Sequence, residues 1–164
     1  MSREHKQHRC KIAIRPATPA DADFILSLVP RFASFKLPKG RSKRGVTSAI
    51  RSEIQRALRE PRPAERFFIA EDAAGHLCGF LHLRAERDFV SGQRACHISN
   101  IAVVRSHDGQ GIGGALLANA HRWAKAHRCK WLTLNVLPGN ARARALYEHS
   151  GFSPDMIRMA KPLT

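Results

Sequence analysis

The sequence predicts an α/β domain of the α+β type, built on a mixed sheet in which most strands are antiparallel. Apolar runs at 66–70, 77–84 and 95–104 are separated by short turns, which favour antiparallel pairing. A later strand, helix and strand over 98–136 favours one parallel neighbour. With 164 residues, 43% of them hydrophobic, residues 1–164 are expected to form a single domain around one core.

The N-terminal part of the chain predicts a basic segment, a strand and two helices. Residues 1–10 are charged and lack the apolar stretch of a signal peptide, so we expect a flexible basic segment. Residues 11–15 alternate as in a strand, and Thr18 with the following proline begins a helix that ends near Pro30. A second helix is expected over 46–59, after a loop rich in proline, glycine and basic residues.

Strands and helices alternate in the remainder of the chain. The run 112–127 has apolar residues at helical spacing, and 130–136 reads as the strand that follows it. Asn140 is placed to cap a further helix, which Gly151 would end. The apolar residues of 156–160 predict one last strand. No apolar run is long enough to span a membrane, and we expect a cytoplasmic protein.

A glycine-rich loop between a strand and a helix is the first candidate for chemistry. Glycines let the backbone turn tightly and approach a ligand, and the N–H groups of the next helical turn attract phosphate. The loop lacks the Gly-Lys-Ser/Thr of a nucleotide triphosphatase, and 125–134 lacks the acidic residue that a dinucleotide fold requires. The glycines concerned are Gly109, Gly111, Gly113 and Gly114.

The stretch Asp108-Gly-Gln-Gly-Ile-Gly113 resembles the acyl-coenzyme A binding motif of the GNAT superfamily of N-acetyltransferases. That motif reads Arg or Gln, two residues, Gly, one residue, Gly or Ala, so that Asp108 stands where Arg or Gln is usual. The resemblance implies a GNAT-like sheet of six or seven strands with about four helices, and acetyl-CoA as cofactor. It implies the following cofactor-binding residues: Ile101, Ala102, Val103, Asp108, Gly109, Gln110, Gly111, Ile112, Gly113, Gly114 and Asn140.

A second stretch resembles the other half of the GNAT core. Asn140 is followed at the family's spacing by Tyr147, the only tyrosine of the chain, and by Gly151-Phe152. In the family, the strand equivalent to 132–136 splays away from its neighbour, and the pantetheine arm enters the gap and contacts the asparagine. The resemblance implies that Tyr147 is catalytic and protonates the leaving thiolate.

The sequence leaves the catalytic base open. Many family members carry a glutamate on one of the two central strands, where this chain has Ser99 and Asn135. His97, Glu86 and Asp88 are near in sequence, and ordered water is an alternative to all three. We predict no metal, because the cysteines are scattered and the histidines show no ligand spacing with acidic residues.

The resemblance implies transfer of an acetyl group from acetyl-CoA to a primary amine by direct attack in a ternary complex. We expect a small-molecule acceptor; the alternatives are a protein N-terminal or lysine acetyltransferase, and a CoA-binding or nucleic-acid-associated module without turnover. The net charge of +15 favours phosphate-bearing or acidic partners. Nucleic acid is the less favoured partner, because no aromatic residues interleave the basic runs. A homodimer is one hypothesis for covering an exposed sheet edge.

Overall fold

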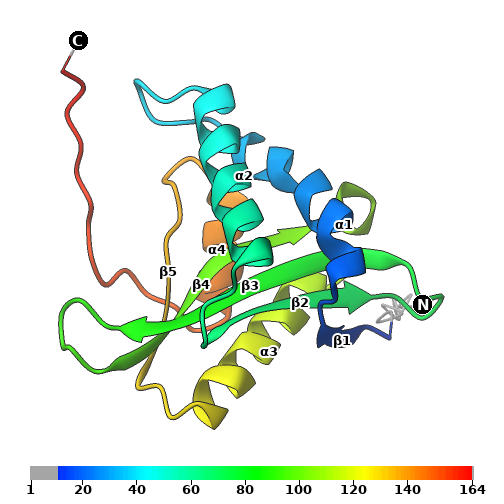
Figure 1. Ribbon diagram of the computed structural model, residues 1–164. Helices are drawn as coiled ribbons and strands as arrows, with labels where there is room; N and C mark the ends of the chain where they lie inside the picture. The colour runs from blue at the N-terminus through cyan, green and yellow to red at the C-terminus, as the bar shows by residue number, and fades with distance from the viewer. Residues whose placement is uncertain (1–10, 164) are drawn as a thin grey trace, which may run out of the picture.

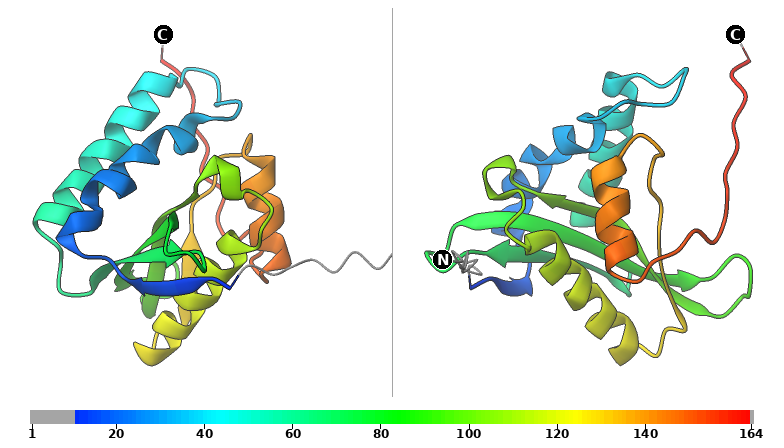
Figure 2. Two further views of the ribbon diagram at one scale, coloured as in Figure 1. Left: turned by 90° about the vertical axis from the view of Figure 1, so that its right-hand side faces the viewer. Right: turned by 180° about the vertical axis from the view of Figure 1, so that it is seen from behind.

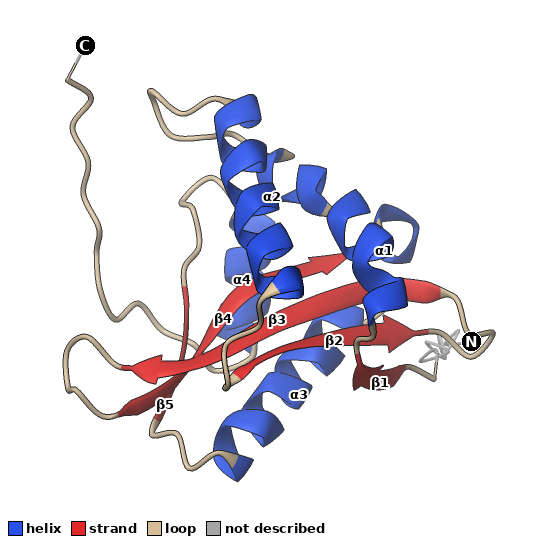
Figure 3. Ribbon diagram, in the orientation of Figure 1, coloured by secondary structure: helices blue, strands red, loops and turns tan. Residues whose placement is uncertain are grey.

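The computed structural model describes residues 11–163, which form a five-stranded sheet with helices on both faces (Figures 1 and 3). The strands are β1 Ala13–Pro16, β2 Glu65–Glu71, β3 Leu77–Arg87, β4 Arg94–Val103 and β5 Trp131–Leu134. They lie side by side in the order of the chain. Strands β1 to β4 pair antiparallel, and β5 pairs parallel with β4, which confirms the predicted mixed, mostly antiparallel sheet.

Four α-helices cover the sheet within the described residues. Helices α1 Ala22–Ser27 and α2 Lys43–Arg59 pack on one face, and α3 Ile112–Ala126 and α4 Ala141–His149 on the other (Figure 2). Successive side chains of a strand point to opposite faces of the sheet, so the same strands pack against both layers of helices. On β3, Phe80 packs into the cluster with α1 and α2, and Leu81 packs into the cluster with α3.

The predicted count of six or seven strands is wrong, because the described residues contain five. The segment expected to form the last strand, 156–160, has no strand partner and leaves the body of the molecule (Figure 1). Its side chains Met156, Ile157 and Met159 are exposed. An apolar run becomes a strand only where a neighbour pairs with its backbone, and composition alone does not supply that neighbour.

The segment before the second helix is more ordered than its composition indicates. The predicted first helix is a 3-10 turn at Pro19–Asp21, then α1, then a second 3-10 turn at Val29–Ala33. Helix α2 begins at Lys43, three residues earlier than expected, because the Ser42 side chain accepts a hydrogen bond from the Gly45 N–H at 3.0 Å. The predicted basic segment 1–10 lies outside the described residues. In the part of the chain that the structure describes, no helix has the length and apolar content to span a bilayer.

An irregularity in β4 opens the sheet. His82 pairs with Asn100 and the next residue, Leu83, pairs with Ile98, so that Ser99 is left out of the β3–β4 register as a bulge. Pairing between β4 and β5 also stops here, at Ile98 and Leu134. Beyond this point the two parallel strands separate, and the gap between them forms part of the cleft described next.

Candidate active site

A cleft of about 1040 Å³ lies between the separated strands and the helices around them. Its walls come from β4, from the end of β5 and the chain that follows it, from the N-terminal end of α3 and from α4. Helix α2 and the 3-10 turn at Val29–Ala33 close the remaining side. The sequence-predicted residues that line it are Ile101, Ala102, Val103, Asp108, Gly109, Gly111, Ile112, Gly113, Gly114, Asn140 and Tyr147.

One predicted residue is absent from this lining. The Gln110 side chain is exposed, and its amide donates to the carbonyl oxygen of Ser106 at 3.3 Å. The local geometry explains this: Gln110 lies between two glycines in the left-handed region, and such a turn directs alternate residues to opposite sides of the loop.

The glycine loop has the backbone geometry expected of an anion site. Gly109 and Gly111 have φ values of +81° and +82°, a conformation that other residues adopt only with strain. Gly111 is the residue immediately before α3, so the first N–H groups of that helix have no acceptor within the helix. Gly113 serves a different purpose, because a Cβ there would come within 2.8 Å of a terminal methyl of Leu146 in α4, and that side chain would have to shift.

The Asp108 carboxylate at the edge of this loop is neutralised by two arginines from distant segments. Arg31, in the 3-10 turn before α2, donates to its two oxygens at 2.9 and 3.0 Å. Arg142, in the first turn of α4, donates to Oδ2 at 2.5 Å. All three residues line the cleft, together with Arg105. The aspartate at the unusual motif position therefore belongs to a net positive group, and its charge is compensated at the site.

Asn140 and Tyr147 lie on the other side of the loop, at the two ends of α4. The Asn140 side chain accepts a hydrogen bond from the Ala143 N–H at 3.2 Å, which confirms the predicted cap. Tyr147 is only 9% exposed, and burial raises its pKa to about 12. Its phenol is therefore protonated throughout the neutral range, in a position on the cleft wall.

The backbone of β4 also presents donors to the gap. The Val104 N–H donates to the Cys78 carbonyl at 2.7 Å, so Val104 faces β3. Because backbone groups alternate in direction along a strand, the N–H groups of Val103 and Ile101 face the opposite side, where β5 has separated. Ser99 lines the same space, and its buried hydroxyl has no hydrogen-bond partner among the described residues.

The residues near in sequence that were considered as a base do not line the cleft. His97 lies where β4 and β5 are still paired, with its Nδ1 2.8 Å from the Thr133 hydroxyl. Burial lowers the pKa of His97, which disfavours its charged form. Glu86 and Asp88 lie farther along the β3–β4 hairpin. None of the three contributes to the described cleft.

A carboxylate from α2 lines the cleft instead. Glu53 shares the lining face of its helix with Ile50, one turn earlier, and Val46, two turns earlier. Its Oε1 lies 3.7 Å from Arg84 of β3. Sequence reasoning missed Glu53, although the spacing of 46, 50 and 53 is that of one helix face. Apart from Asp108, Glu53 is the acidic residue that the described lining contains.

Asn100, next to the bulge, is held by a buried polar chain. Its Oδ1 lies 3.0 Å from Nδ1 of His82, and Nε2 of His82 lies 3.0 Å from Oε1 of Glu65. Phe67 stacks on the His82 ring, with centroids 4.0 Å apart. Burial lowers the pKa of His82 despite these partners. The chain fixes the Asn100 side chain where β4 borders the cleft.

Comparison with known proteins agrees with this geometry. The model of the acetyltransferase (GNAT) family matches residues 38–152. An uncharacterized N-acetyltransferase of Bacillus subtilis, YhfO, is 27% identical over 142 residues, which make up 87% of this chain and 90% of that protein. The solved structure of a Pyrococcus furiosus protein described as an acetyl transferase is 25% identical, with a TM-score of 0.74 over 93% of this chain and 100% of that one.

The aminoglycoside N-acetyltransferase AAC(6')-Iy, solved in complex with CoA, shares the fold. It is 17% identical, with a TM-score of 0.68 over 94% of this chain and 97% of that one. The matched region 38–152 contains the glycine loop, both separated strands and Tyr147. The predicted recognition and the predicted enzyme class, an acyltransferase, are confirmed. This chain belongs to the acetyltransferase (GNAT) family.

Proposed function

We propose that this protein transfers the acetyl group of acetyl-CoA to the primary amine of a small molecule, by direct attack within a ternary complex. The observation that carries the proposal is the continuity of one cleft. It runs from the glycine loop, past the separated strands and Tyr147, to the Glu53 carboxylate of α2. A cofactor and an acceptor can therefore enter from different ends and meet between the strands.

The loop end of the cleft suits the phosphates of CoA. Residues 109–114 offer glycine backbone and the first N–H groups of α3, and the nearby arginines Arg31, Arg105 and Arg142 add positive charge. The pantetheine arm would then lie along β4, beside Ile101, Ala102 and Val103, with Asn140 across the gap. When bound, acetyl-CoA supplies a thioester whose carbonyl carbon accepts the amine.

The protein's own groups match the needs of this reaction. The Val103 N–H faces the gap and can donate to the thioester oxygen as negative charge develops there. The amine nitrogen forms a bond to the carbonyl carbon and releases a proton to solvent, the carbon–sulfur bond breaks, and Tyr147 donates its phenolic proton to the departing sulfur and regains one from solvent. Burial raises the pKa of the phenol to about 12, so Tyr147 keeps its proton until negative charge develops on the departing sulfur.

The end of the cleft that would hold the acceptor carries a negative charge, which can attract the ammonium group of a protonated amine. Glu53 attracts the protonated amine and accepts a proton from it, directly or through water, so that the attacking nitrogen is neutral. The Ser99 hydroxyl and the Asn100 amide belong to β4 and line the same cleft as Glu53, and they can orient the amine. A small amine is favoured over a peptide, because α2 and the 3-10 turn before it close that side of the cleft.

Release of CoA from acetyl-CoA in the presence of acceptors tests the proposal. The panel should contain aminosugars, polyamines and amino acids, and also peptides with free N-termini or lysines. We expect turnover with small amines, and a kcat/KM at least tenfold lower in Glu53→Gln with unchanged CoA affinity. Glu148→Gln, on the exposed side of α4, is the matched control. Turnover confined to peptides would contradict the small-molecule acceptor, and an unaltered Glu53→Gln variant would contradict the role of Glu53.

A further inference from the structure

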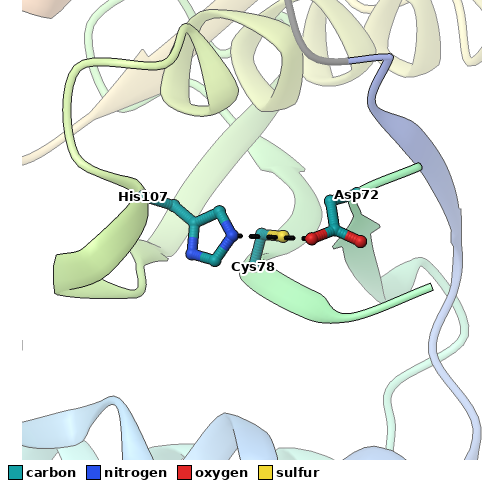
Figure 4. Close-up of side chains that lie close together, drawn as sticks. All are labelled: Asp72, Cys78 and His107. Carbon is teal, nitrogen blue, oxygen red and sulfur yellow. Dashed lines mark ion pairs between the residues drawn. The ribbon is translucent and has the colours of Figure 1, made fainter. Parts of the chain in front are cut away.

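We propose that Asp72, Cys78 and His107 bind a zinc ion at a site beside the glycine loop (Figure 4). The three side chains come from separate segments. Asp72 follows β2, Cys78 lies near the start of β3, and His107 ends the 3-10 turn Arg105–His107 that leads into the loop. A carboxylate oxygen, a sulfur and an imidazole nitrogen from these residues lie within 4.8 Å of one another. The sequence did not predict this site, because the three ligands do not form a local motif.

The spacing of the donor atoms fits a tetrahedral ion. Zinc binds nitrogen and oxygen at about 2.0–2.2 Å and sulfur at about 2.3 Å, so neighbouring ligands of a tetrahedron lie roughly 3.3–3.8 Å apart. His107 Nε2 lies 3.6 Å from Asp72 Oδ2. This distance is too long for a hydrogen bond, and it falls within the range expected for two neighbouring ligands of a tetrahedral zinc ion. In the view of Figure 4, the Cys78 sulfur overlaps the line that joins the His107 nitrogen to the Asp72 oxygen, and all three atoms lie within 4.8 Å of one another. Small adjustments would bring all three atoms to an ion.

Asp72 and His107 are each oriented by a contact through the other atom of the side chain, which leaves one donor atom directed at the cluster. The other ring nitrogen of His107, Nδ1, lies 3.0 Å from the Ser106 hydroxyl. The other carboxylate oxygen of Asp72, Oδ1, accepts the N–H groups of Ala74 and His76 at 2.8 and 2.9 Å. Outer contacts of this kind fix the rotamer and the tautomer of metal ligands. An ion would compete with two existing bonds, from His76 Nδ1 to Asp72 Oδ2 at 3.0 Å and from the Cys78 thiol to the carbonyl oxygen of His76 at 3.1 Å.

The chemistry of the donors favours zinc over harder cations. A thiolate and an imidazole prefer a borderline-soft ion, whereas magnesium and calcium prefer oxygen alone. Cys78 is buried, but the side chains of Asp72 and His107 are 14% and 22% exposed, so solvent can occupy a fourth position. On binding, the Cys78 thiol loses its proton to solvent and the sulfur bonds to the metal. The ion would then tie the β2–β3 turn to the segment that enters the glycine loop.

Titration of the chelator-treated full chain with Co²⁺, followed by competition with Zn²⁺, tests this proposal without any substrate. We expect one Co²⁺ per chain, a thiolate-to-cobalt charge-transfer band, tetrahedral ligand-field bands, and displacement of all of these by Zn²⁺. His107→Gln and Asp72→Asn should weaken binding by about 10- to 100-fold. Both positions are partly exposed, so these variants test the site even if a change at buried Cys78 prevents folding.

Matched controls separate this site from other thiols and imidazoles. A variant with both Cys10→Ser and Cys129→Ser should retain the charge-transfer band, and His149→Gln, on the exposed side of α4, should retain the affinity. Zinc should also raise the melting temperature of the native chain and of these controls, but not that of His107→Gln. No stoichiometric binding by the native chain would overturn the proposal. So would equal binding by His107→Gln and His149→Gln, or a Co²⁺ spectrum without the thiolate band.

Discussion

Replacing Asp108 with asparagine should lower the stability of the protein and raise its affinity for CoA. The variant loses the ion pairs to Arg31 and Arg142, at 2.9 and 2.5 Å. The side chains of Asp108 and Arg31 are 22% and 24% exposed, and that of Arg142 is 63% exposed. Ion pairs as accessible as these contribute at most about 1 kcal/mol each, and the more exposed pair contributes less. The free energy of unfolding should fall by roughly 0.5–1.5 kcal/mol.

The affinity should change in the opposite direction, because Asp108 is a negative charge beside the proposed phosphate site. Unit charges about 4–8 Å apart in water interact by about 0.5–1 kcal/mol, which corresponds to a Kd roughly two- to fivefold lower. Calorimetric titration with CoA measures this gain, which should shrink as salt is added. Glu148→Gln removes one negative charge outside the cleft lining and is the control. Weaker binding by Asp108→Asn than by the native chain would refute this reasoning, because it would make Asp108 the organiser of a phosphate site.

Three further changes test other parts of the molecule. Tyr147→Phe removes the proposed proton donor, so kcat in the CoA-release assay should fall by roughly 10²- to 10⁴-fold. The Kd for CoA should stay within about twofold of the native value. An unchanged kcat would exclude Tyr147 as the acid. Burial opposes ionisation of Glu65, but hydrogen bonds from Arg56 and other donors outweigh burial and hold the pKa of Glu65 at about 2. The ionised carboxylate therefore stabilises the fold at pH values above about 4.5, and this stabilisation is lost as the pH falls from about 4.5 towards 2. Glu65→Gln should therefore cost roughly 2–3 kcal/mol in urea unfolding at pH 7 and much less near pH 2, whereas an equal cost at both values would argue against the ionic role. In Gly139→Ala the new Cβ would overlap the carbonyl oxygen of Lys36, so the variant should be less stable by about 1–3 kcal/mol. Gly114 lies in the first turn of α3 with open space around it, so Gly114→Ala should be more stable by about 0.5–1 kcal/mol. Melting temperatures that change in the same direction in both variants would contradict this packing account.

The parts of the site that the sequence predicted are those whose residues lie close together in the chain. The glycine loop, the Asn140 cap and Tyr147 each depend on residues within about two helical turns, where spacing and local geometry are directly coupled. Asp108 shows the limit of that reasoning. The sequence showed only that Asp108 departs from the motif, whereas its effect at the site depends on Arg31 and Arg142, which the fold brings from distant segments.

The features that the sequence did not predict depend on which segments become neighbours. Glu53 lines the cleft because α2 crosses the face of the sheet at that point, and no local pattern specifies the crossing. The absent sixth strand has the same origin, since 156–160 is apolar enough for a strand but pairs with nothing in the described chain. The Ser42 cap, by contrast, was a local signal that could have placed the start of α2 correctly.

Isothermal titration of the purified chain with acetyl-CoA tests the central claim most directly, when the native chain is compared with Gly111→Trp and Gly92→Trp. Both glycines have positive φ and open space around them, at +82° and +67°, so both substitutions carry backbone strain. Of the two, only Gly111 lies on the cleft. We predict one site per chain in the native protein and in Gly92→Trp, with binding lost in Gly111→Trp. Failure of the folded native chain to bind, or equal binding by both tryptophan variants, would contradict the assignment of this cleft to acetyl-CoA.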